Sequence, residues 1–135
     1  MTTISSSGEL PLRNEHEIVL GRQAVRRLAQ DQGFSLVDQT KFVTATSELA
    51  RNALIYGGGG TLKWEVLLEG TKRGVRLTFQ DQGPGIPNVE LAMTDGWSSG
   101  TGMGLGLGGA RRLVNEFELD STVGVGTRVT VTRWK

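Results

Sequence analysis

Two polar residues four positions apart, Glu48 and Asn52, lie within an apolar stretch that has helical spacing. Side chains at positions i and i+4 of a helix lie on the same face, so this carboxylate and this amide oxygen can converge on one point. Such a pair suits two roles, a general base for a hydroxyl or a water, and a ligand of magnesium, which prefers oxygen donors. The same spacing is common on solvated helix faces, so the pair indicates a site only together with polar residues elsewhere.

Asp81 is the second residue whose position suggests chemistry. It ends an alternating segment, residues 75–81, and the period of two puts it on the same face as the apolar side chains. A carboxylate aimed at a core needs a partner, and the exocyclic amine of adenine is one, with Gly83 and Gly85 allowing close approach of the backbone to a base. The alternative is that Asp81 caps a turn. Thr127 also points inward from its strand, and its hydroxyl could bind a base directly or through a water.

A glycine-rich stretch, residues 100–109, comes directly before a predicted helix that begins near Ala110. Free backbone N–H groups at the start of a helix form an anion site suited to phosphates. Gly104, Gly106 and Gly109 also satisfy the dinucleotide-binding spacing GxGxxG. That interpretation is rejected, because no strand precedes these glycines.

The elements that must position these residues follow from hydrophobic periodicity and turn residues. Residues 1–9 are predicted to be a disordered lead-in, because a Ser-rich segment buries little, and one domain spans residues 10–135. Ser35 is a predicted helix N-cap. We expect a short strand over 16–20, helices over 21–32, 36–56 and 110–116, a helical turn over 88–94, and strands over 61–68, 75–81, 117–121 and 127–134. These elements predict an α+β fold, a two-layer sandwich with helices on one face of a mixed, mostly antiparallel sheet.

Composition narrows the class of function. The chain has 135 residues, enough for a single core, and its 15 Lys and Arg residues against 14 Asp and Glu residues argue against a nucleic-acid footprint. It has no cysteine, which excludes disulfides, zinc thiolate sites and thiol catalysis. No apolar run approaches the ~20 residues of a membrane span. We therefore expect a cytoplasmic protein that binds neither nucleic acid nor membrane.

Three segments in this order, ELARN at 48–52, DQGPGIP at 81–87 and GTGMGLGLGGARRL at 100–113, followed by Gly126 and Thr127, resemble the N, G1 and G2 boxes of the GHKL (Bergerat-fold) ATPases. Among these ATPases the chain looks most like the small bacterial switch kinases, the RsbT-type serine/threonine-protein kinases of the stressosome. The resemblance covers roughly residues 13–135. It implies the Bergerat fold, with ATP and Mg²⁺ bound.

By this resemblance, Glu48 would be the catalytic base that activates a substrate hydroxyl, Asn52 would hold the magnesium, and Asp81 would bind the adenine amine. Thr127 would complete the base site. The other residues implied to form the nucleotide pocket and its lid are Gly83, Gly85, Ile86, Gly102, Met103, Gly104, Leu105, Gly106, Leu107 and Gly108.

The resemblance also implies partners. The substrate would be a serine or threonine on a STAS-domain protein of the stressosome or antagonist kind, and the freed kinase would activate a PP2C-type phosphatase in a bacterial stress response. The main alternative is an anti-sigma factor of the same fold that sequesters a sigma factor. A further alternative is an ATP-sensing module without catalysis. The three segments do not separate these functions, because each needs ATP.

Overall fold

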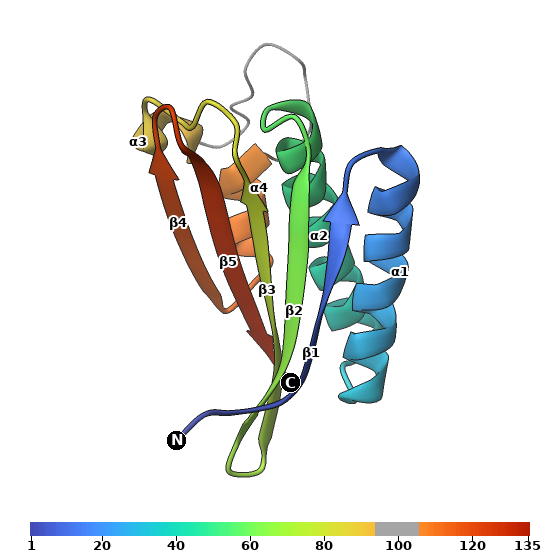
Figure 1. Cartoon of the computed structure of the whole chain (residues 1–135). Coiled ribbons are helices and arrows are strands. Elements are labelled where there is room, and N and C mark those ends of the chain that lie inside the picture. Colours follow the sequence, from blue (N-terminus) through green and yellow to red (C-terminus); the bar gives the residue numbers. More distant parts are fainter. Residues whose placement is uncertain (94–105) are drawn as a thin grey trace.

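Helices cover one face of a single antiparallel sheet in the computed structural model, which describes residues 1–93 and 106–135 (Figure 1). The sheet has five strands in the order β1-β2-β3-β5-β4, and all neighbours are antiparallel. The predicted α+β sandwich is confirmed, although the pairing is antiparallel throughout rather than mixed. The strands are β1 (Thr3–Leu12), β2 (Gly60–Glu69), β3 (Lys72–Asp81), β4 (Glu116–Thr122) and β5 (Gly126–Trp134), and the helices are α1 (Glu15–Asp31), α2 (Leu36–Ile55), α3 (Val89–Ala92) and α4 (Gly106–Arg112). Within the described residues, no helix is long and apolar enough to cross a bilayer.

The prediction that residues 1–9 are disordered is wrong. Residues 3–9 belong to edge strand β1, which pairs with β2 from Thr3 opposite Leu68 to Leu12 opposite Gly60. Backbone hydrogen bonding satisfies this polar segment, and the strand is anchored where its last residue, Leu12, is fully buried. The prediction from composition considered only side-chain burial and therefore missed the pairing.

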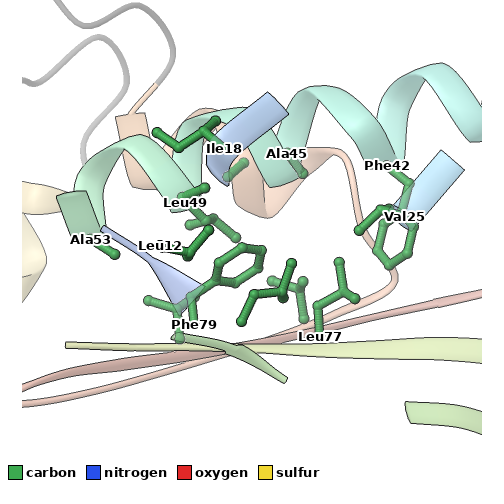
Figure 2. Close-up of a cluster of buried hydrophobic side chains, with 14 of the residues drawn as sticks. Leu12, Ile18, Val25, Phe42, Ala45, Leu49, Ala53, Leu77 and Phe79 are labelled. Carbon is green, nitrogen blue, oxygen red and sulfur yellow. The ribbon is translucent and has the colours of Figure 1, made fainter. Parts of the chain in front are cut away.

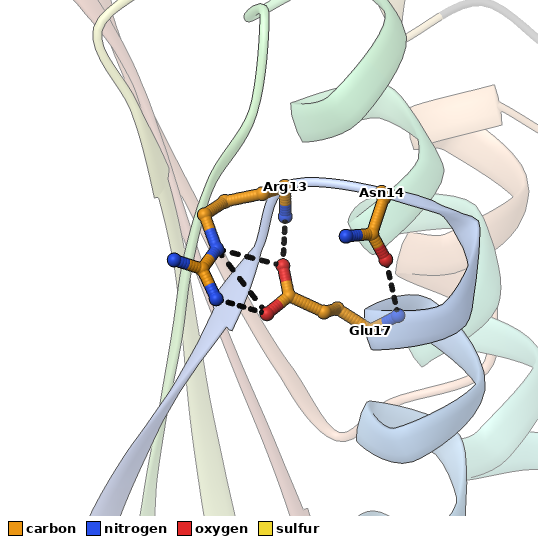
Figure 3. Close-up of polar contacts among 3 residues, drawn as sticks. All are labelled: Arg13, Asn14 and Glu17. Carbon is orange, nitrogen blue, oxygen red and sulfur yellow. Dashed lines mark hydrogen bonds and ion pairs between the residues drawn. The ribbon is translucent and has the colours of Figure 1, made fainter.

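The predicted strand over residues 16–20 is also wrong, because these residues form the first part of α1. Asn14 is the N-cap, and its side chain accepts a hydrogen bond of 2.9 Å from the Glu17 amide (Figure 3). The helix is amphipathic from this point, with Ile18, Gly21, Val25 and Ala29 buried on one face.

An ion pair joins the end of β1 to the start of α1. The Glu17 carboxylate accepts hydrogen bonds from the Arg13 guanidinium at 2.7 Å and from the Arg13 amide at 2.7 Å (Figure 3). The side-chain hydrogen bond from Arg13 holds the pKa of Glu17 below its ordinary value, against the opposing effect of burial. A carboxyl group with a depressed folded pKa stabilises the fold above its unfolded pKa, and this contribution is lost as the pH falls through the folded pKa.

We therefore expect Glu17→Gln to lower the melting temperature by a few degrees at about pH 7, and the gap from wild type to close as the pH falls below the ordinary pKa of a glutamate and through the depressed pKa of Glu17. The measurement is thermal unfolding across this pH range. Glu15→Gln is the control, because Glu15 is exposed and its ion pair among the described residues, with Arg51, is long at 3.7 Å. A gap that stays constant with pH would contradict the contribution assigned to Glu17.

Helix α2 agrees with its prediction. Ser35 caps it, accepting a hydrogen bond of 3.1 Å from the Asp38 amide, and the helix ends before the glycines at 57–60. Gly58 and Gly59 both have positive φ angles, 74° and 108°, which lead the chain away from the helix axis.

The core lies between the helices and the sheet (Figure 2). Its labelled members come from β1, α1, α2 and β3; they are Leu12, Ile18, Val25, Phe42, Ala45, Leu49, Ala53, Leu77 and Phe79. The side of this core near the end of α2 continues into the candidate site.

The C-terminal half differs from the prediction in the bounds of one helix. The helix predicted over 110–116 spans Gly106–Arg112 instead, and β4 begins at Glu116. The residues from Gly106 to Ala110 are all buried, and α4 packs on α2. Glycine is a poor helix former, but without side chains it permits a close helix contact, and tertiary packing overrides the local preference here.

Candidate nucleotide-binding site

A cavity of about 320 Å³ lies between α2 and the ends of β3 and β5. This is within the range of small-molecule sites, which are mostly apolar with a few placed polar groups. The polar side chains on its wall are Asn52, Asp81 and Thr127, together with Tyr56. The complete lining is Leu49, Asn52, Ala53, Tyr56, Phe79, Asp81, Pro84, Gly85, Ile86, Pro87, Gly106, Leu107, Thr127 and Val129.

Asp81 lies at the end of β3, and strand register places it directly opposite Thr127 of β5. Its Oδ1 accepts a hydrogen bond of 2.9 Å from the Gly83 amide. Among the residues that the structure describes, none donates a hydrogen bond to Oδ2. One oxygen therefore caps the turn, as the alternative interpretation predicted, and the other is available to a ligand in the cavity.

Gly57, which directly follows the last turn of α2, packs against Asp81, a contact that was not predicted from the sequence. A Cβ at position 57 would lie 2.3 Å from Cγ and 2.6 Å from Oδ2 of Asp81. Gly83 packs against the same backbone, since its own Cβ would lie 2.6 Å from the Cα of Gly57. Gly83 is absent from the cavity lining, so it supports the floor rather than approaching a ligand. No local feature of the sequence predicts this contact.

We expect Gly57→Ala to weaken nucleotide binding about tenfold or more, because the added methyl group must displace the Asp81 carboxylate. The variant should also lose about 1–3 kcal/mol of stability through overpacking. The measurements are nucleotide titration by calorimetry and thermal unfolding.

The control is Gly58→Ala. Gly58 has a φ of 74° and open space around it, so this change strains the backbone without touching Asp81. It should lower stability and leave nucleotide affinity near that of wild type. If Gly57→Ala binds nucleotide with the affinity of wild type, the proposed displacement of the Asp81 carboxylate is contradicted.

A hydroxyl of β4 supports Thr127. Ser121 and Thr127 are register partners, and their side-chain oxygens lie 2.8 Å apart. The Ser121 oxygen also accepts a hydrogen bond of 2.8 Å from the Ile86 amide, which ties the loop after β3 to the sheet. The sequence analysis missed Ser121, although it shares the inward phase of Phe117 and Leu119.

Helix α2 brings Asn52 into the cavity lining as predicted, whereas Glu48, one turn earlier, is not part of that lining. Glu48 Oε2 is buried, and no described residue gives it a hydrogen bond. An unpaired buried polar atom costs free energy, so it marks a place where a ligand or substrate group fits. Oxygen donors at Glu48 and Asn52 also suit Mg²⁺, which is commonly held by one or two side chains together with nucleotide phosphates. In the described part of the chain, no cluster of three or more acidic or histidine residues could hold a metal alone.

The glycine-rich segment is only partly described. Gly106 and Leu107 line the cavity, and Gly108 is buried within α4. The predicted lid residues Gly102, Met103, Gly104 and Leu105 lie outside the described residues. Gly85 lines the cavity with a φ of 78°, and its Cβ would lie 2.5 Å from the Thr122 carbonyl oxygen, so it serves both the turn and the close packing on β4.

This geometry agrees with the comparisons with known proteins. The family described as histidine kinase-, DNA gyrase B- and HSP90-like ATPase matches residues 37–135, and the chain belongs to this ATPase family. ATP binding follows from the family. The chain is also 42% identical over 123 residues to the serine/threonine-protein kinase RsbT of Bacillus subtilis (strain 168). The aligned residues cover 91% of this chain and 92% of that protein. This likeness places the chain among the serine/threonine-protein kinases of the family and confirms the predicted resemblance.

Two solved structures support the fold. The RsbU and RsbW domains of Rv1364c from Mycobacterium tuberculosis match with a TM-score of 0.64 at 20% identity, covering 97% of this chain and 33% of that one. The histidine kinase domain of the Erythrobacter litoralis EL346 blue-light activated histidine kinase matches with a TM-score of 0.53 at 18% identity, covering 91% and 60%.

Proposed function

We propose that the chain is the ATP-dependent serine/threonine-protein kinase of a cytoplasmic partner-switching pathway, with a STAS-domain protein as its substrate. The observation that supports this proposal is that Asp81, Thr127 and Asn52 line one cavity, with the buried Glu48 carboxylate one helical turn before Asn52 on α2. The likeness to RsbT over nearly the whole of both chains supports the kinase activity.

Each polar residue then has a role. The free Oδ2 of Asp81 accepts the exocyclic amine of adenine, with Thr127 beside it. Asn52 holds the magnesium that accompanies ATP, and bound magnesium would offset phosphate charge. The residues from Pro84 to Pro87 and Leu107 cover the apolar faces of the nucleoside.

Glu48 is the proposed general base. Its buried oxygen accepts the proton of the substrate hydroxyl as that hydroxyl oxygen forms a bond to the γ-phosphorus and the bond to the β,γ-bridging oxygen breaks, so that ADP leaves. Phosphoryl transfer asks the protein mainly to position groups and to neutralise charge. The rigid helix α2 meets that need by presenting both oxygens one turn apart.

The partners follow from the resemblance to RsbT-type kinases. The hydroxyl belongs to a serine or threonine of a STAS-domain stressosome or antagonist protein, and the kinase, once released, activates a PP2C-type phosphatase. The competing function is that of an anti-sigma factor.

One experiment tests the proposal and the alternative together. The pure chain is incubated with ATP, Mg²⁺ and a STAS-domain protein encoded beside it, and the added phosphate is located by mass spectrometry. In parallel, the chain is used to capture partners in the presence of ATP. Phosphate on a STAS serine or threonine supports the proposal. Capture of a sigma factor without any STAS phosphorylation would replace the proposed kinase function with the anti-sigma function.

A further inference from the structure

Three groups form a continuous chain of hydrogen bonds at the base end of the cavity. The Ile86 amide lies 2.8 Å from Ser121 Oγ, and Ser121 Oγ lies 2.8 Å from Thr127 Oγ1. Thr127 lines the cavity, and Ile86 lines it from the opposite loop, whereas Ser121 lies behind both. The Ser121 hydroxyl therefore acts on the cavity only through its neighbours.

The direction of this chain follows from chemistry. A backbone amide can only donate, so Ser121 Oγ accepts the hydrogen bond from Ile86. The Ser121 proton then has two acceptors within reach, Thr127 Oγ1 at 2.8 Å and the Gly126 carbonyl oxygen at 3.4 Å. The shorter contact has the distance typical of an O–H···O hydrogen bond, and the longer one exceeds that range.

When the Ser121 hydroxyl donates to Thr127 Oγ1, the Thr127 hydroxyl does not donate to Ser121. Its own proton can then be donated to a ligand in the cavity. Asp81 lies opposite Thr127 across the strand pair and, as a carboxylate, only accepts. The cavity then presents an acceptor beside a donor. The edge of adenine carries the complementary pair, the amine at position 6 as donor and N1 as acceptor, whereas a base with a carbonyl at position 6 carries an acceptor and an N1 donor, the reverse pair.

We propose that Ser121 is a positioning residue for base selection, which sets the Thr127 hydroxyl as a donor and so favours adenine over 6-oxo purines. The inference rests on the proposed nucleotide site, because it assigns the orientation of a hydroxyl within that site. Asp81 supplies one half of the recognition and the Ile86–Ser121–Thr127 chain supplies the other.

The test compares binding of ATP and of inosine triphosphate by calorimetry, in wild type and in Ser121→Ala. Wild type should prefer ATP. In Ser121→Ala the Thr127 hydroxyl is free to accept or donate, and the preference should fall about tenfold, the effect of one hydrogen bond. Ser121→Thr keeps the hydroxyl and should restore the preference, which a purely structural role for the side chain would not require. Thr122→Ala, at the exposed neighbouring position of β4, is the matched control and should bind like wild type.

Thermal unfolding without nucleotide shows whether each variant is folded. Should Ser121→Ala fail to fold, Ser121→Cys, which keeps the size with a weak donor, should show the same loss of preference. An unchanged ratio of the two affinities in a folded variant, with ATP still bound, would overturn the inference and leave the proposed function intact. Failure of wild type to bind ATP would overturn the proposed nucleotide site itself.

Discussion

Phosphoryl transfer by Glu48→Ala should be about 10²- to 10⁴-fold slower than by wild type, with ATP affinity little changed. The reason is the position of the side chain, since Oε2 has no hydrogen-bond donor among the described residues and Glu48 does not line the cavity. A group that contacts the bound nucleotide little in the ground state, and takes a proton only during transfer, affects the rate rather than binding.

The same substitution has a second expected consequence. Glu48 Oε2 is buried without a hydrogen-bond donor among the described residues, and removing this oxygen in Glu48→Ala, or the charge in Glu48→Gln, relieves a desolvation cost. Both variants should therefore match or exceed the stability of wild type, by up to about 1 kcal/mol. Loss of activity together with retained or increased stability is typical of a residue kept for function.

The measurements are the rate of phosphate incorporation into the substrate protein, ATP titration and thermal unfolding. Thr44→Ala is the control on the same helix, one turn earlier, where the hydroxyl only bonds the Thr40 carbonyl at 2.8 Å. It should transfer phosphate at the wild-type rate. Transfer by Glu48→Ala at the wild-type rate would remove the base assignment.

The second large effect is expected for Asp81→Asn, which should weaken ATP binding about 100-fold. The variant keeps an oxygen to accept the Gly83 amide, so the turn and the fold should persist. Its amide nitrogen then takes the place of Oδ2 and presents a donor to the donor amine of adenine, which loses a charge-assisted hydrogen bond and leaves polar groups unpaired.

Replacing a hydrogen-bond acceptor with a donor at position 81 also predicts a change in nucleotide preference. An amide nitrogen at position 81 can donate to a carbonyl at position 6 of a purine, so inosine triphosphate should lose much less affinity than ATP, or gain. Calorimetry with both nucleotides measures the change. Asp120→Asn is the matched control, because Asp120 is exposed and its ion pair among the described residues is with Arg128 at 3.1 Å. Equal ATP affinity in wild type and Asp81→Asn would show that Asp81 does not bind the base.

Much of the fold was predictable because its signals are local. The caps and the period of 3.6 located α2 within a residue of its observed ends, and the period of two located β2, β3 and β5. Three predictions failed for physical reasons. The N-terminal segment gains its order from backbone pairing, residues 16–20 follow the Asn14 cap into α1, and α4 begins four residues early because its glycines pack on α2.

The candidate site also contains residues that were predicted from the sequence and residues that were not. Asn52, Asp81 and Thr127 were expected on inward phases, and the structure brings them to one cavity. Their roles remain proposals that the variants above test. Gly57 and Ser121 were not expected to support the site, because each acts through a residue distant in the sequence.

The sequence by itself determined which residues lie on the inward faces of α2, β3 and β5, because side-chain direction in a helix or strand depends only on position along the element. Only the tertiary structure decided which of these faces meet, that Asp81 stands opposite Thr127 and against Gly57, and that Ser121 links Thr127 to Ile86. Those contacts depend on strand order, register and close packing between distant segments, and such properties arise only when the whole core is assembled.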